Sequence, residues 1–106
     1  MGYVWLVAAI AAEVTATTAM KYSEGFSRPG PSLLTVLGYV VSFALLALTL
    51  RTVGIGTAYA IWSGIGTASI AVLGMLLFGE GLGAAKVAGI VLIVLGVVVL
   101  NLGGAH

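Results

Sequence analysis

Four long apolar stretches occupy almost all of this 106-residue chain, at about residues 3–20, 33–50, 57–78 and 86–102. Each is close to the ~20 residues that an α-helix needs to cross a hydrocarbon core about 30 Å thick. The connections are too short to hold a soluble catalytic or ligand-binding domain, at about 21–32, 51–56 and 79–85. The sequence therefore predicts an all-α membrane protein with four transmembrane helices in a single domain, residues 1–106.

The composition agrees with a membrane location and excludes several functions. Hydrophobic residues make up 61% of the chain and charged residues 7%, against roughly 25% charged residues in ordinary soluble domains. The chain has no cysteine, its one histidine is the last residue, His106, and its net charge is +1. We therefore expect no metal site and no nucleic-acid partner. With no nucleophile–base pair or phosphate-binding loop, we also expect no enzymatic activity and no cofactor.

A single carboxylate, Glu13, lies inside the first apolar stretch, and the next charged residue is Lys21. At 1.5 Å per residue it would lie about 16 Å into the membrane, near the midplane. Desolvation there disfavours the charged form of a carboxylate, whereas a nearby cation favours it. Because ionisable groups in hydrocarbon are costly and usually functional, Glu13 is predicted to bind a proton or a cation. The small residues Ala9, Ala16 and Thr17 on its face leave room for a ligand or for a neighbouring helix.

Two aromatic stripes occur at helical spacing in the second and third stretches. The first consists of Tyr39, Ser42, Phe43 and Leu46, and the second of Tyr59, Trp62, Ser63 and Gly66. An aromatic wall opposite a carboxylate suits a hydrophobic cation, whose charge the carboxylate neutralises and whose apolar body the rings hold. The alternative is an aromatic core stripe whose hydroxyls are satisfied by neighbouring helices.

Glycines in the last two stretches suggest roles in bending and association. Gly64 and Gly66 lie near the middle of the third stretch, where they could form a hinge or a close packing point. Gly89 and Gly96 lie seven residues apart on the fourth stretch, with Ile93 between them. Four helices are too few to enclose a chamber closed on both sides, so we expect a dimer whose interface contains Gly89, Ile93 and Gly96.

Two segments of the chain resemble the small multidrug resistance family. The first comprises AEV at 12–14, Thr17 and MKYSEGF at 20–26, and the second is AYAIWSGIG at 58–66. The resemblance implies a proton-coupled antiporter of the prokaryotic inner membrane that exports hydrophobic and quaternary ammonium cations and uses the proton gradient. It also implies an antiparallel homodimer, with one protomer inserted each way. That topology fits the weak charge bias, since Lys21, Arg28 and Lys86 lie in loops on one side against Arg51 on the other.

The resemblance also implies roles for individual residues. Glu13 of both protomers would form a shared site for protons and cations. The aromatic lining would be Tyr39, Tyr59 and Trp62, the polar contacts Thr17, Ser42 and Ser63, the hinge Gly64 and Gly66, and the entrance Tyr3.

The family contains two kinds of exporter that bear on the substrate. Guanidinium exporters carry a Trp at the position of Ala16, whereas multidrug exporters have a small residue there and a Ser-Glu-Gly-Phe loop, as in residues 23–26. The chain therefore resembles the multidrug subtype, although Ala44 stands where those members commonly have an aromatic residue. Guanidinium export is the alternative within the family. A proton-carrying proteolipid subunit is an alternative outside it.

Overall fold

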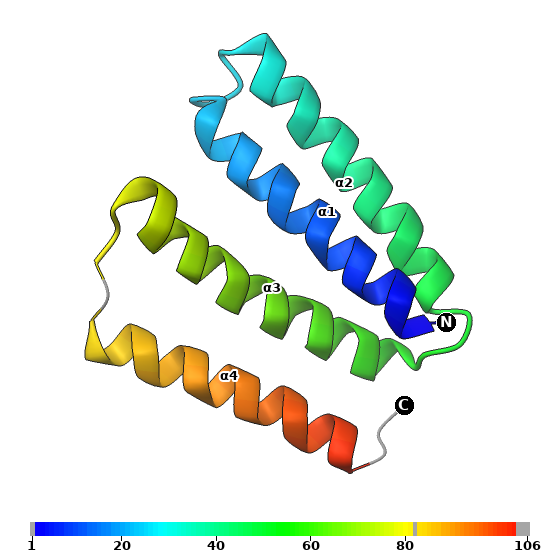
Figure 1. Cartoon of the computed structure of the whole chain (residues 1–106). Coiled ribbons are helices and arrows are strands. Elements are labelled where there is room, and N and C mark those ends of the chain that lie inside the picture. The colour runs from blue at the N-terminus through cyan, green and yellow to red at the C-terminus, as the bar shows by residue number, and fades with distance from the viewer. Residues whose placement is uncertain (1, 82, 104–106) are drawn as a thin grey trace. The chain divides into compact units, whose positions relative to one another are not determined.

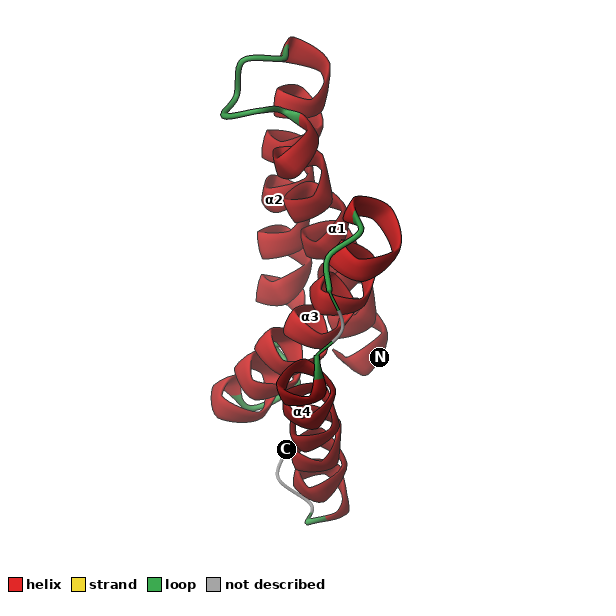
Figure 2. Ribbon diagram, turned by 90° about the vertical axis from the view of Figure 1, so that its left-hand side faces the viewer, coloured by secondary structure: helices red, strands yellow, loops and turns green. Residues whose placement is uncertain are grey.

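The computed structural model describes residues 2–81 and 83–103. These residues form four α-helices: α1 (Gly2–Tyr22), α2 (Pro29–Thr49), α3 (Ile55–Phe78) and α4 (Ala84–Leu102), as Figure 1 shows. Over the described ranges helices are the only regular elements, joined by short turns (Figure 2). All four helices are long and apolar enough to cross a membrane. The predicted all-α membrane fold is confirmed.

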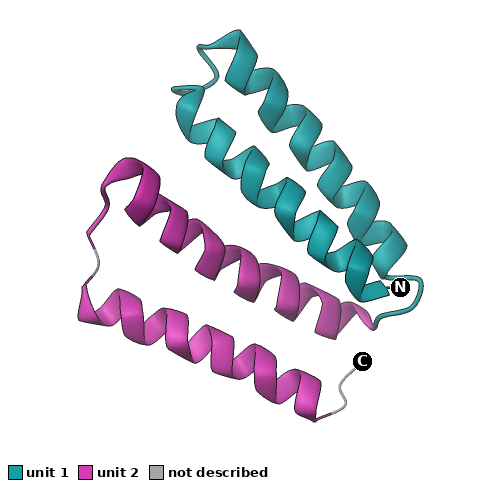
Figure 3. Cartoon of the chain, viewed as in Figure 1, with its two compact units in different colours: residues 1–53 teal, residues 54–106 magenta. Residues whose placement is uncertain are grey.

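The chain divides into two compact units, Met1–Val53 and Gly54–His106 (Figure 3). The first unit is a hairpin of α1 and α2, which pack closely against each other. The second is a hairpin of α3 and α4, whose contact is less extensive. A single four-helix domain stays a prediction.

The helices begin earlier than the sequence suggested. The second helix begins at Pro29 rather than at about residue 33, and Arg28 precedes it in an extended conformation. Proline is well suited to the first helical position, because the N–H that it lacks would have no partner within the helix there. The other three helices also start one or two residues before their expected positions. The connection expected at 21–32 is therefore shortened to residues 23–28.

Buried small residues recur at intervals of seven along the hairpin of α1 and α2. Every member of the two rows is buried: Gly2, Ala9 and Ala16 of α1 with Ser23 in the turn that follows it, and Thr35, Ser42 and Thr49 of α2. We call these two rows the small-residue seam. An interval of seven is close to two helical turns, so both rows stay in contact along the hairpin when the helices cross at about 20°. Small side chains let the two backbones approach closely.

The backbones of α1 and α2 approach each other closely at Gly38. A Cβ atom added at this position would lie 2.7 Å from the Cβ atom of Ala16 and 3.2 Å from the carbonyl oxygen of Ala12. One turn further along α2, the fully buried Ser42 hydroxyl donates a hydrogen bond of 2.8 Å to the carbonyl oxygen of Ala9. The hairpin is therefore held by close backbone contact and by one buried interhelical hydrogen bond.

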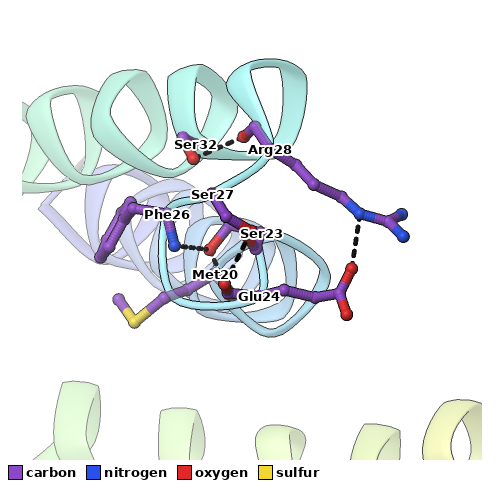
Figure 4. A network of polar contacts seen from close by, with 7 residues as sticks. All are labelled: Met20, Ser23, Glu24, Phe26, Ser27, Arg28 and Ser32. Carbon is purple, nitrogen blue, oxygen red and sulfur yellow. Dashed lines mark hydrogen bonds and ion pairs between the residues drawn. The ribbon is translucent and has the colours of Figure 1, made fainter.

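The turn between α1 and α2 is organised around Ser23 (Figure 4). Its buried hydroxyl donates to the carbonyl oxygen of Met20 at 2.6 Å and accepts from the backbone N–H of Phe26 at 3.1 Å. Glu24, Gly25 and Phe26 all have positive φ angles, of 48°, 74° and 67°. Such a conformation costs a residue other than glycine about 1–2 kcal/mol. The hydrogen bonds of Ser23 offset part of this cost and stabilise a tight turn.

In the second hairpin, α3 lies close to α4 at Gly64. A Cβ atom added there would lie 3.2 Å from Ile93 Cγ2 and 3.3 Å from Val97 Cγ2 of α4. The third helix runs without a break through Gly64 and Gly66 and ends at Gly79, whose φ is +66°. The close contact supports the packing role for Gly64 that the sequence left open. The hinge role of the two glycines stays a prediction.

Candidate cation-binding site

Glu13 lies near the middle of α1, at the side of the small-residue seam, and is partly buried. It belongs to a second row with an interval of seven, between Leu6 and Met20. This row borders the seam, so the carboxylate is close to α2 of its own hairpin. The sequence thus places one acidic group in the middle of a helix that is long and apolar enough to cross a membrane and whose other charged residue, Lys21, lies in the last turn.

Two hydroxyl groups connect this carboxylate to the second helix. Thr17, one turn further along α1, donates from Oγ1 to Glu13 Oε1 at 3.0 Å. The same Thr17 oxygen lies 2.6 Å from the hydroxyl oxygen of Tyr39 on α2. A threonine hydroxyl has only one hydrogen to donate, so in this arrangement Tyr39 is the donor to Thr17. The structure therefore brings Glu13, Thr17 and Tyr39 together in one chain of hydrogen bonds, which we call the hydroxyl chain.

The small residues beside Glu13 are used for packing within the hairpin. Ala9 and Ala16 are completely buried, the first beneath the Ser42 hydroxyl and the second against Gly38. Of the two alternatives that the sequence left open, these contacts support helix approach. A large side chain at position 16 would have to separate α1 from α2.

The aromatic stripe of α2 divides between two faces. Tyr39 and Ser42 lie toward α1, and Ser42 is fully buried. Phe43 is 55% exposed and does not join the hydroxyl chain. Contact of Ser42 and Phe43 with a substrate stays a prediction.

The second aromatic group lies on α3. The rings of Tyr59 and Trp62 meet edge to face, with centroids 5.6 Å apart and planes at 76°. Tyr59 is 59% exposed, so part of its ring surface is open to a ligand. The Ser63 hydroxyl donates to the carbonyl oxygen of Tyr59 at 2.8 Å. The aromatic pair expected from the spacing is therefore present. That the pair lines the substrate site stays a prediction.

The remaining predicted residues lie at the end of α1 and along α4. Tyr3 is 39% exposed in the first turn of α1. Ile93 lies against Gly64 of the same chain, whereas Cβ atoms added at Gly89 or Gly96 would meet nothing within 4 Å in the described part of the chain. Their roles at the entrance and in a dimer interface stay predictions. Within residues 2–81 and 83–103, no three His, Cys, Asp or Glu side chains gather as metal ligands; His106 lies outside these ranges.

Sequence reasoning missed Gly38, which holds α2 against Ala16 directly beside the hydroxyl chain. It also did not predict that the Thr17 hydroxyl forms hydrogen bonds with both Glu13 and Tyr39. No regular spacing marks Gly38, which lies four residues before Ser42 on α2 and outside the rows with an interval of seven. The spacing of four between Glu13 and Thr17 was a signal for their hydrogen bond.

Comparison of this chain with known proteins identifies its family. Residues 1–93 match the family described as Small Multidrug Resistance protein. A multidrug resistance protein of Mycolicibacterium paratuberculosis is 49% identical, with all of both chains covered. The quaternary ammonium compound-resistance protein QacE of Escherichia coli is 48% identical over 95% of this chain and 92% of its own. The multidrug resistance protein EbrB of Bacillus subtilis is 43% identical, over 99% and 90%.

These matches define a class of membrane transporters for small molecules. The chain belongs to the small multidrug resistance family. It is accordingly a multi-pass protein of the cell membrane, with four helices long enough to span it.

Proposed function

We propose that this protein exports hydrophobic and quaternary ammonium cations in exchange for protons, and that both ligands bind Glu13. The observation that carries the proposal is a partly buried carboxylate in the middle of a membrane-spanning helix, with a hydroxyl donor directed at one of its oxygens. Thr17 donates a hydrogen bond to Glu13 Oε1, and an ionised carboxylate attracts a cation. Protonation removes the same charge, so the two ligands exclude each other.

The substrate class follows from the aromatic side chains and from the relatives. Tyr59 and Trp62 offer an edge-to-face pair with open ring surface, and such rings attract organic cations by cation–π contact. One relative is named for resistance to quaternary ammonium compounds, and others for multidrug resistance. The burial of Ala16 against Gly38 leaves no space for the Trp that guanidinium exporters carry. These observations favour bulky cations over guanidinium ions.

Transport would occur in an antiparallel homodimer with Glu13 from both protomers in a shared site. None of the described residues of α4 is buried, and Gly89 and Gly96 leave open space where another helix can approach. Occupancy by a proton or a cation would allow the dimer to exchange its outward and inward openings, while the proton gradient sets the direction of export. Gly64 and Gly66 would absorb the bending of α3.

Calorimetric titration of the purified protein with tetraphenylphosphonium between pH 5 and 9 tests this function. We expect affinity to weaken as the pH falls and Glu13→Gln to abolish binding, while Glu24→Gln behaves as wild type, because Glu24 is paired with Arg28 at the surface. Guanidinium is titrated in parallel. If only guanidinium binds, the substrates are guanidinium ions and not hydrophobic or quaternary ammonium cations. Wild-type binding by Glu13→Gln would overturn the proposal.

A further inference from the structure

The hydroxyl chain of Glu13, Thr17 and Tyr39 distinguishes the two ligands of the site. We propose that it is a hydrogen-bond switch: its hydroxyls point toward Glu13 when the carboxylate is ionised and reverse when the carboxylate is protonated. Thr17 is then a positioning residue. This inference rests on the proposed competition of protons and cations for Glu13, and deepens it.

In the ionised state, the carboxylate has no hydrogen and can only accept. Thr17 donates to Glu13 Oε1 at 3.0 Å, and the Tyr39 hydroxyl, 2.6 Å from Thr17 Oγ1, donates to Thr17. The hydroxyl hydrogen of Tyr39 is therefore used in a hydrogen bond to Thr17 of α1. Hydrogen bonds in series polarise one another, so Tyr39 strengthens the bond between Thr17 and the carboxylate.

Protonation of Glu13 at Oε1 gives the carboxyl group its own hydrogen. The carboxyl group can then donate to Thr17, Thr17 turns its hydrogen toward Tyr39, and the Tyr39 hydrogen becomes available to a different acceptor. Each hydroxyl keeps its hydrogen, and the change requires only rotation about C–O bonds.

A bound cation gives the opposite result, although it neutralises the same charge. The carboxylate remains ionised beside a cation, so Thr17 and Tyr39 keep their first orientation. Proton and cation occupancy therefore leave Tyr39, on the neighbouring helix, in two different hydrogen-bonding states. This difference is the kind of differential contact that a transporter needs in order to respond differently to its two ligands.

Few other ionisable groups face this chain within its hairpin. Tyr39 is the only titratable residue between Pro29 and Thr49, so α2 presents no charged side chain to Glu13. On α1, Tyr3 lies near the start of the helix, and Lys21 and Tyr22 lie in its last turn. A change in pH dependence on altering Thr17 therefore reports on the hydroxyl chain.

The test is the pH midpoint of tetraphenylphosphonium binding in three variants, Thr17→Val, Thr17→Ser and Thr18→Val. Thr17→Val keeps the shape but removes the donor to the carboxylate, so we expect the midpoint to rise by about one pH unit, the equivalent of one charged hydrogen bond. Thr17→Ser should restore the wild-type midpoint. Thr18→Val is the matched control, because the Thr18 hydroxyl donates to the carbonyl oxygen of Val14 on its own helix.

The serial connection gives a further test. Tyr39→Phe should raise the midpoint by less than Thr17→Val, and the double variant should equal Thr17→Val alone, because Tyr39 reaches Glu13 through Thr17. Additive shifts would show two independent contacts and overturn the switch. So would a Thr17→Val midpoint equal to that of wild type.

A measurement without ligand separates this inference from the proposed function. The NMR signal of the Tyr39 ring carbon bonded to oxygen should titrate together with the Glu13 carboxyl carbon in wild type, and should no longer follow it in Thr17→Val. A Tyr39 signal that follows Glu13 equally in both proteins contradicts the switch. Wild-type cation binding that is independent of pH contradicts the proposed competition, whatever the NMR result.

Discussion

Replacing Gly38 by alanine should damage both the hairpin and the candidate site. The new Cβ atom would lie 2.7 Å from Ala16 Cβ, whereas ordinary contact begins at 3.4 Å, so the helices must separate by about 0.7 Å. Gly38 and Ala16 directly precede Tyr39 and Thr17 in the sequence. A separation of this size along the hydrogen bond would lengthen the 2.6 Å Thr17–Tyr39 distance to about 3.3 Å, beyond the usual range for two hydroxyls.

Overpacking of this kind costs about 1–3 kcal/mol in the free energy of unfolding. Alanine also has a higher helix propensity than glycine, by about 1 kcal/mol, so the cost is best measured against a glycine with open space. Gly56→Ala serves as this control, because a Cβ atom there would meet nothing within 4 Å. We expect Gly38→Ala to be the less stable variant by about 1–3 kcal/mol when both are unfolded by SDS in mixed micelles.

A second substitution tests whether the contact itself is responsible. Changing Ala16 to glycine in the Gly38→Ala protein removes the 2.7 Å contact and leaves only contacts of 3.2 Å, so most of the lost stability should return. The tetraphenylphosphonium pH midpoint should rise in Gly38→Ala and return toward wild type in the double variant. Stability and midpoint both equal to those of Gly56→Ala would show that the Gly38–Ala16 contact constrains neither the hairpin nor the site.

Substitutions at three further positions probe individual contacts. Ser42→Ala removes the buried hydrogen bond to the Ala9 carbonyl oxygen and should lower stability by about 1 kcal/mol; a loss of cation affinity with no loss of stability would instead identify Ser42 as a substrate contact. Ser23→Ala removes the acceptor of the Phe26 N–H, so amide hydrogen exchange at Phe26 should accelerate; unchanged exchange would contradict the role given to Ser23. Gly64→Val should weaken the contact with α4 and lower the melting temperature, whereas Gly64→Ala should lower it less, because the facing atoms lie 3.2–3.3 Å from an added Cβ.

The four helices could be predicted from the sequence because length and apolarity are sufficient to identify membrane-spanning segments. Their starts were less predictable, because Pro29-Gly30-Pro31 reads as a turn and yet forms the first turn of α2. Proline ends a helix in its interior but begins one at its N-terminus, and the local sequence does not distinguish the two cases.

The candidate site was predicted only in part. Glu13 stood out because charge is rare in this chain, and the aromatic pair Tyr59–Trp62 followed from its spacing. On α2, however, Ser42 and Phe43 point about 100° apart around the helix axis, and spacing alone does not say which of them faces α1. The close contact of Gly38 with Ala16 places Ser42, one turn after Gly38, on the side of α2 that faces α1. The two backbones approach where the side chains are smallest.

Exchange of a cation for protons across a membrane is the most direct test of whether both ligands use Glu13. Protein reconstituted into liposomes that hold a pH-sensitive dye is given an outward gradient of tetraphenylphosphonium, with no pH gradient at the start. We expect acidification of the lumen by wild type and by Glu24→Gln, and none by Glu13→Gln. Acidification by Glu13→Gln at the wild-type rate would contradict the assignment of both ligands to this carboxylate.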